Sequence, residues 1–147
     1  MSELTTMVLY AKDIVEGDFI SLTPETNALD AAKIMKEKRR GFVIVVSGDK
    51  PFGIATEWDY LSKIVALERN PAKVNLGEIM SENVFTVKGS DGIDYVSKLM
   101  AERGIRRVLV VDDDKLLGVI TSKTVLSRLE DYINSVSAQI ARLNSPM

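Results

Sequence analysis

A hydroxyl and a carboxylate stand three residues apart in the stretch Thr56-Glu57-Trp58-Asp59. Residues 53–55 read as a short strand, so Thr56 lies where the chain turns from a strand into a helix. The first turn of a helix has unpaired backbone N–H groups and a partial positive charge, and it therefore attracts anions. This arrangement could bind a phosphate at Thr56 and the hydroxyls of a ribose at Asp59.

The same pair has a simpler explanation as a capping box. In that motif a Thr N-cap and an acidic residue of the first turn satisfy each other's backbone N–H groups. Such boxes occur at many helix starts and need no ligand. These residues by themselves leave both interpretations open.

The chain repeats the surroundings of this pair once. Residues 41–61 align with residues 106–126 at a constant offset of 65 residues, and the register extends upstream to Ile14 and its counterpart Ile79. Two copies of one unit indicate a pair of similar subdomains related by a pseudo-twofold axis.

The repeat divides the chain into five expected segments. They are a leader at 1–10, a first motif at 11–69, a linker at 70–75, a second motif at 76–130 and a helical extension at 131–147. The sequence does not decide whether the leader covers a groove or forms part of a helix.

Composition excludes several classes of function. The 147 residues are 46% hydrophobic and 27% charged, which is typical of a globular domain. A net charge of −2 argues against nucleic-acid binding, which usually needs a basic domain. The absence of Cys and His excludes disulfides, thiolate nucleophiles, His-based triads and Cys/His zinc sites. We expect no metal.

The sequence also predicts where the protein is found. No apolar run approaches the roughly 20 residues that span a bilayer. The first ten residues lack the pattern of a secretory signal. We therefore expect no membrane association and a cytoplasmic location, with which the lack of Cys is compatible.

Residue patterns predict the same order of elements in each copy. In the first copy we expect a strand at 19–22, a helix from Thr26 or Asn27 to a C-cap at Gly41, strands at 42–46 and 53–55, and a helix at 59–68. In the second copy we expect a strand at 83–87 and a helix at 93–103 that is capped by Gly104. Two strands at 107–111 and 117–120 follow, joined by an acidic turn, and a last helix begins at Thr121.

The last helix continues past the end of the repeat. Its apolar residues are spaced 3, 4, 3, 4 and 3 apart, which is the pattern of a short a/d seam: Leu126, Leu129, Ile133, Val136, Ile140 and Leu143. Such a seam either packs on its own domain or joins a partner subunit, and both alternatives stay open.

These features together resemble a tandem pair of CBS domains (cystathionine β-synthase domains), also called a Bateman module. The first copy carries Val45-Val46, Phe52-Gly53-Ile54 and Thr56-Glu57-Trp58-Asp59, and the second carries Val110-Val111-Asp112, Leu117-Gly118-Val119 and Thr121-Ser122-Lys123-Thr124. The resemblance rests on the repeat in register, because no single motif is specific. It implies an α/β (α+β) fold of two pseudo-symmetric β-α-β-β-α repeats packed as one module.

The resemblance also implies a function. Modules of this kind are regulatory, bind adenine nucleotides (AMP, ADP or ATP) between the two motifs, and commonly pair as disc-shaped homodimers. Carried over to this chain, the site comprises Thr56, Arg106 and Arg107 at the phosphate, Asp59 at the ribose, and Ile20, Thr23, Gly41 and Phe42 around the base. Any effector would be a separate protein.

The pseudo-symmetric second cleft departs from this pattern twice. Thr124 stands where the first copy has Asp59, so the ribose loses a charged acceptor that is worth about 1.5–3 kcal/mol. Gly41-Phe42 stand where the second copy has Arg106-Arg107, so the phosphate loses its cation, which Arg39-Arg40 would replace only in part. We therefore expect one competent site per chain.

Two other functions remain open beside nucleotide sensing. The chain could be a ligand-independent scaffold that forms oligomers through its repeat and its C-terminal seam, or its cleft could take another adenosyl compound such as S-adenosylmethionine. Catalysis is not expected, because the sequence contains no activated nucleophile, Gly-rich loop with Lys, or paired-carboxylate motif. Neither the preferred nucleotide nor the regulated target can be read from the residues.

Overall fold

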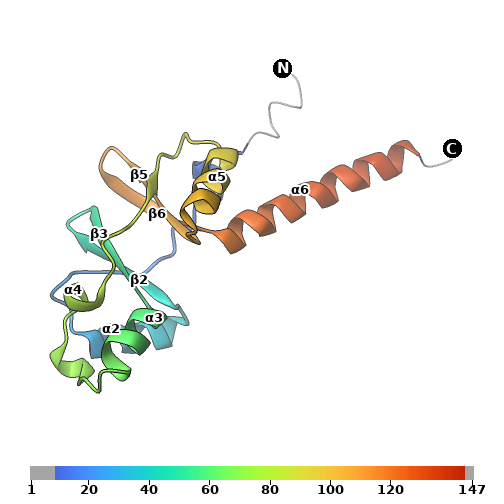
Figure 1. Cartoon of the computed structure of the whole chain (residues 1–147). Coiled ribbons are helices and arrows are strands. Elements are labelled where there is room, and N and C mark those ends of the chain that lie inside the picture. Colours follow the sequence, from blue (N-terminus) through green and yellow to red (C-terminus); the bar gives the residue numbers. More distant parts are fainter. Residues whose placement is uncertain (1–8, 145–147) are drawn as a thin grey trace.

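The computed structural model describes residues 9–144, so most of the expected leader lies outside the described residues. The chain forms two lobes, each built on a three-stranded sheet (Figure 1). The first sheet has the order β1 (Ser21–Leu22), β2 (Phe42–Ser47) and β3 (Lys50–Thr56). The second has the order β4 (Thr86–Val87), β5 (Arg107–Asp112) and β6 (Lys115–Thr121). In each sheet the first pair of strands is parallel and the second is antiparallel.

Helices join and cover these sheets. They are α1 (Ala11–Ile14), α2 (Ala28–Lys38), α3 (Glu57–Tyr60) continued by a π-helical turn (Leu61–Val65), a short 3-10 turn (Pro71–Lys73), α4 (Leu76–Ile79), α5 (Ile93–Arg103) and α6 (Ser122–Leu143). The predicted α/β fold with two β-α-β-β-α repeats and a long C-terminal helix is confirmed. The expected bounds of α5 and its Gly104 cap are also confirmed. Helices α1 and α4 were not predicted, because four residues are too few to show a helical period.

The predicted C-cap at Gly41 is wrong. Helix α2 ends at Lys38, and its C-cap Arg39 adopts the left-handed conformation with φ 55° and ψ 47°. The helix closes there because the N–H of Arg40 donates to the carbonyl of Met35 at 3.0 Å, a Schellman-type bond. Gly41 serves a close approach instead, since a Cβ at this position would clash with the Glu57 carboxylate.

The helix expected at 59–68 also has different bounds. Thr56 is its N-cap, so the helix begins at Glu57, and the π-helical turn ends at Val65. Glu68 then adopts a left-handed conformation with φ 55°.

Each lobe completes its core with a short helix from the start of the other repeat. The core of the first lobe includes Leu76 and Ile79 of α4, and the core of the second includes Ala11 and Ile14 of α1. A third cluster of buried residues comes from both sheets: Ile44, Ile54, Leu109 and Val119. The two repeats are therefore interlocked.

Two glycines at equivalent positions of the repeats allow each short helix to pack in the lobe of the other repeat. Gly53 of β3 lies against the segment that follows α4, and a Cβ there would stand 2.7 Å from the carbonyl oxygen of Ser81. Gly118 of β6 lies against the segment that follows α1, and a Cβ there would clash with the Glu16 carbonyl. The glycine of the hydrophobic-Gly-hydrophobic motif is thus needed for a close backbone crossing.

Helix α6 extends away from the two lobes (Figure 1). Val125 is its buried residue, whereas Leu126, Ile133 and Leu143 are 67%, 60% and 85% exposed. Within residues 9–144, the seam therefore does not pack on its own domain, which rules out that alternative for the described part of the chain. No helix in the described range is both long and apolar enough to cross a membrane.

Candidate functional site

Thr56 and Asp59 form the predicted capping box at the start of α3. The Thr56 hydroxyl accepts a hydrogen bond from the Asp59 N–H at 3.3 Å. In return, Oδ2 of Asp59 accepts from the N–H of Thr56 at 2.9 Å and from its hydroxyl at 3.1 Å. Oδ1 of Asp59 lies 3.0 Å from Nζ of Lys63. Asp59 is 7% exposed, so its carboxylate is both buried and paired.

A cleft of about 370 Å³ opens beside this helix start. The first lobe contributes Gly41, Thr56, Glu57, Trp58 and Leu61, and the second contributes Arg106 and Arg107. The structure thus brings together the predicted residues Thr56, Gly41, Arg106 and Arg107 from two segments about fifty residues apart. A helix N-terminus and two guanidinium groups face one space, which is an environment suited to an anion.

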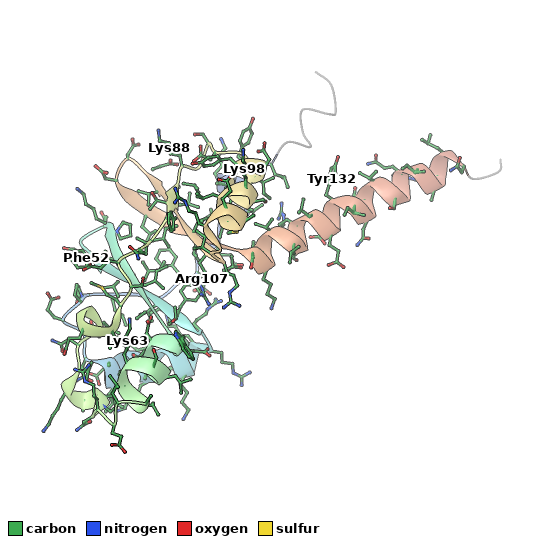
Figure 2. All side chains as sticks on the ribbon, viewed as in Figure 1. Phe52, Lys63, Lys88, Lys98, Arg107 and Tyr132 are labelled. Carbon is green, nitrogen blue, oxygen red and sulfur yellow. The ribbon has the colours of Figure 1, made fainter. Side chains whose placement is uncertain are left out.

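Arg107 lies at the junction of the lobes, where Figure 2 labels it. Its guanidinium carbon is 4.7 Å from the centre of the Phe42 ring, within the range of a cation–π contact. Burial lowers the pKa of Arg107 from its ordinary value, and the charge of Arg106 lowers it further. Arg nevertheless stays protonated in proteins.

Nε of Arg107 is buried and has no hydrogen-bond partner among residues 9–144. Buried polar groups are usually paired, since leaving a donor unsatisfied costs about 1–3 kcal/mol. Arg107 also forms no ion pair within the described part of the chain. It therefore has donor capacity to spare beside the cleft.

Other predicted site residues lie apart from this cleft. Ile20 is 6% exposed and belongs to the core of the first lobe. Thr23 is exposed, and its hydroxyl lies 3.1 Å from that of Thr26. Asp59 lies at the helix start but does not line the cleft, and Phe42 lines a neighbouring one.

Sequence reasoning missed three residues that line the cleft: Glu57, Trp58 and Leu61. Trp58 carried a usable signal, because it is the one Trp of the chain and falls inside the Thr-x-x-Asp motif. It is 69% exposed, an unusual position for so large an apolar side chain.

The second cleft, of about 580 Å³, is lined by Arg39 and Arg40, which were expected to compensate in part for the missing cation, and by further basic residues that were not expected. Five basic residues line it: Arg39, Arg40, Arg107, Lys123 and Arg128. The first two reach the cleft because α2 ends at Lys38, and the last two because α6 begins beside it. Arg40 is also paired with Asp18 at 2.8 Å.

A carboxylate also reaches this second cleft, from a distant part of the sequence. Thr124, which replaces the aspartate of the first copy, donates a hydrogen bond from its hydroxyl to Oε1 of Glu16 at 2.6 Å. Thr124 also pairs with the hydroxyl of Thr121 at 2.9 Å. Glu16 thus brings the acidic group that the motif itself lacks, and it is already hydrogen-bonded within the protein.

Comparison with known families places this geometry in context. The family model described as "CBS domain" matches residues 11–66 and 76–131. The uncharacterised protein MK0525 of Methanopyrus kandleri is 37% identical over 123 residues, which are 82% of this chain and 62% of that protein. A homoserine O-acetyltransferase of Methanohalobium evestigatum is 31% identical over 84% of this chain but only 24% of its own length. The chain therefore spans part of both relatives.

Solved structures have the same fold. The CBS domain pair of protein MJ0100, in complex with 5′-methylthioadenosine and S-adenosyl-L-methionine, is similar with a TM-score of 0.71 and 31% identity over 84% of this chain and 97% of that one. The hexameric CBS-CP12 protein from bloom-forming cyanobacteria has a TM-score of 0.71 and 33% identity over 81% of this chain and 70% of that one.

Proposed function

This chain belongs to the CBS domain family, and on that premise we propose that it is a regulatory module that binds AMP, ADP or ATP. The proposed site is the cleft where the start of α3 faces Arg106 and Arg107. The observation that carries the proposal is the unpaired donor of Arg107 beside an anion-attracting helix start. The protein would act without catalysis, on a separate partner protein.

The parts of a nucleotide can be assigned to this cleft. Its phosphates would bind Arg106 and Arg107 and would lie at the positive end of α3, because guanidinium groups and helix N-termini both favour phosphate. The N–H groups of Glu57 and Asp59 are already donated to the Gly41 carbonyl and the Thr56 hydroxyl. The exposed ring of Trp58 offers a face for the base. Asp59 would bind the ribose hydroxyls only by exchanging part of its present hydrogen bonds.

The other predicted contacts receive different support. Gly41 lines the cleft and Phe42 holds the guanidinium of Arg107, so both fit the proposal. Ile20 and Thr23 stay predictions from the family resemblance, since neither lines the cleft.

A ligand in this position would link the two lobes. Its phosphates would contact the second lobe, while the helix start that completes the site belongs to the first. A ligand shifts a conformational equilibrium by its difference in affinity for the two states. We propose that the nucleotide favours one arrangement of the lobes and so alters contacts in a homodimer or with an effector.

The proposal retains one competent site per chain. The second cleft has ample positive charge, but neutral Thr124 stands at the motif position of Asp59, and Lys123 stands at the position of Trp58. We also propose that the protein is cytoplasmic and uses no metal.

Thermal unfolding with added ligands tests this proposal. At one hundred times the dissociation constant, binding adds about 2.7 kcal/mol of stability, roughly 5–10 °C for a domain of this size. We expect AMP, ADP or ATP to raise Tm in the wild type and in Thr124→Ala but not in Asp59→Ala. Each variant is compared with its own ligand-free Tm, because Asp59→Ala also removes a cap. Loss of the shift in Thr124→Ala as well would contradict a single site.

S-adenosylmethionine in the same experiment tests a second candidate ligand. The MJ0100 domain pair, which is similar to this chain, was solved with adenosyl compounds that carry no phosphate. A shift with this compound that survives Arg107→Ala would favour an adenosyl site over a nucleotide site. If none of the four compounds raised Tm at millimolar concentration, the nucleotide and adenosyl hypotheses would both fail. The ligand-independent scaffold would then be the remaining function.

A further inference from the structure

We propose that α6 is a self-recognition helix through which two copies of this chain pair in parallel. The contact is the seam: Leu126, Leu129, Ile133, Val136, Ile140 and Leu143. This inference specifies how the proposed homodimer forms, and it does not depend on nucleotide binding.

Within residues 9–144, most of α6 packs on no core of its own chain. Of its 22 residues, Val125 is the buried one, so 126–143 contains no buried residue. Most helical stability in proteins comes from packing an apolar face, and isolated helices of this length are marginal in water. A partner that covers the seam would supply the missing contacts.

The outer half of α6 has few of the residues that keep a helix stable in water. Residues 132–141 contain no Asp, Glu, Lys or Arg, so no ion pairs between successive turns form within this stretch. They include one Asn, two Ser, two Ile and one Val, which are weaker helix formers than Ala or Leu. A helix that stays in water is normally charged on its exposed faces, so this stretch is better suited to an interface.

The residue types of the seam indicate that its partner is the same helix of a second copy of this chain. With a first spacing of three, Leu126, Ile133 and Ile140 fall at a positions, and Leu129, Val136 and Leu143 fall at d positions. Two of the three a residues are Ile and two of the three d residues are Leu, the combination that favours parallel, two-stranded pairing. This pattern therefore points to two helices rather than three or four.

Residues beside the seam allow two identical helices to meet. The flanking e and g positions of the outer half are Tyr132, Ser137 and Gln139, and none is charged. A parallel pair therefore brings no like charges together there. Because the seam has only about two and a half heptads, we expect reversible pairing that depends on concentration.

The rival occupant is the N-terminal segment of the same chain. Leu9 lines a hollow of about 510 Å³ on α6 together with Arg128, Asp131, Tyr132, Ser135, Val136 and Gln139. Val136 is the one seam residue in that set. The other five α6 positions lie off the seam, so this contact leaves most of the seam open to a second copy.

Cysteine cross-linking tests the pairing directly, because the chain has no Cys of its own. In a parallel pair the two copies of residue 140 face each other, so Ile140→Cys should form a disulfide-linked dimer under mild oxidation. Ala138→Cys, two residues away on the outer face, is the matched control and should stay largely monomeric. Cross-linking only in a mixture of Ile140→Cys and Leu129→Cys would mean antiparallel pairing and would overturn the proposal.

Sedimentation equilibrium gives an independent measurement of the same contact. Ile133→Glu with Ile140→Glu should weaken dimerisation at least tenfold and lower helical circular dichroism, whereas Ala138→Glu should do neither. If the double variant still dimerised, the seam would not be the dimer contact, although the protein would still be a homodimer. A monomeric wild type that dimerises only after removal of residues 1–8 would identify the N-terminal segment as the occupant. The ligand-dependent Tm shift, measured on the same variants, reports separately on nucleotide binding.

Discussion

At the scale of single residues, Arg107 connects the most features of the candidate site. It lines both clefts, lies over the Phe42 ring and keeps an unpaired donor at Nε. A half-buried guanidinium whose buried Nε has no hydrogen-bond partner among residues 9–144 is costly unless a ligand or partner compensates it. The residue therefore fits an anion site better than it fits a structural role.

Arg107→Ala should weaken nucleotide binding by about tenfold or more, because a charge-assisted hydrogen bond contributes about 1.5–3 kcal/mol. Arg103→Ala is a matched control, since its guanidinium also lies over an aromatic ring, Phe85 at 5.4 Å, but lines neither cleft. Isothermal titration calorimetry measures both affinities. Equal dissociation constants for the two variants would remove Arg107 from the site.

At the scale of elements, side-chain hydrogen bonds close the starts of α2, α3 and α4. Asn27 caps α2 with its side-chain oxygen, and Thr56 and Asp59 form the capping box of α3. In α4, Oε2 of Glu78 accepts a hydrogen bond from the N–H of Asn75 at 2.8 Å, and its Oε1 lies 2.9 Å from Arg69. These local bonds secure helices that are too short to be stable alone.

Glu78 links the stability of α4 to pH. The backbone hydrogen bond from Asn75, followed by the contact with Arg69, lowers the pKa of Glu78 from its ordinary value of 4.5. A carboxylate with a lowered folded-state pKa stabilises the protein above its unfolded pKa, and this contribution is lost as pH falls through the folded pKa. Glu78→Gln should therefore have a lower Tm than the wild type at neutral pH.

The difference in Tm between wild type and Glu78→Gln should shrink as pH falls below about 4.5 and the wild-type carboxylate becomes protonated. Glu82→Gln provides the control, because the Glu82 side chain forms no ion pair with any of residues 9–144. Thermal unfolding followed between neutral and acidic pH measures the effect. A difference that is independent of pH would assign it to geometry rather than charge.

At the scale of the whole molecule, the two repeats are not the two lobes. Helix α4 begins the second repeat but packs in the first lobe, and α1 begins the first repeat but packs in the second. Paired backbone hydrogen bonds secure both crossings, between Ile54 and Ser81 and between Glu16 and Val119. The lobes also share a buried cluster from both sheets, so each repeat contributes to the packing of both lobes.

Two reciprocal substitutions test the exchange of helices. Ile79→Ala should destabilise the protein by about 2–5 kcal/mol, as buried Ile-to-Ala changes do, and should speed amide exchange mainly in β2 of the first lobe. Ile14→Ala should have a similar cost and speed exchange mainly in β5 of the second. Denaturant unfolding and hydrogen exchange measure both effects. If Ile79→Ala sped amide hydrogen exchange more in β5 than in β2, α4 would not pack in the first lobe, and the proposed crossing of the short helices would be wrong.

Much of this arrangement could be predicted from the sequence because its signals are local. Hydrophobic runs with turn residues marked the strands, and Asn27 and Gly104 marked the limits of helices. The repeat at a constant offset indicated two similar units, and the Thr56–Asp59 pair indicated a capped helix start. Each of these inferences uses residues that are close in the chain, where backbone geometry fixes which side chains meet.

The remaining features depend on contacts between distant segments, which no local period records. Glu16 meets Thr124 across 108 residues, and the short helices α1 and α4 exchange lobes. The sequence predicted Gly41 as a helix cap, whereas in the structure this glycine allows the Glu57 side chain to approach the backbone. The sequence by itself determined the repeated unit and its capped helix start. The tertiary structure decided which side chains share a cleft, because the packing of two interlocked cores sets those distances.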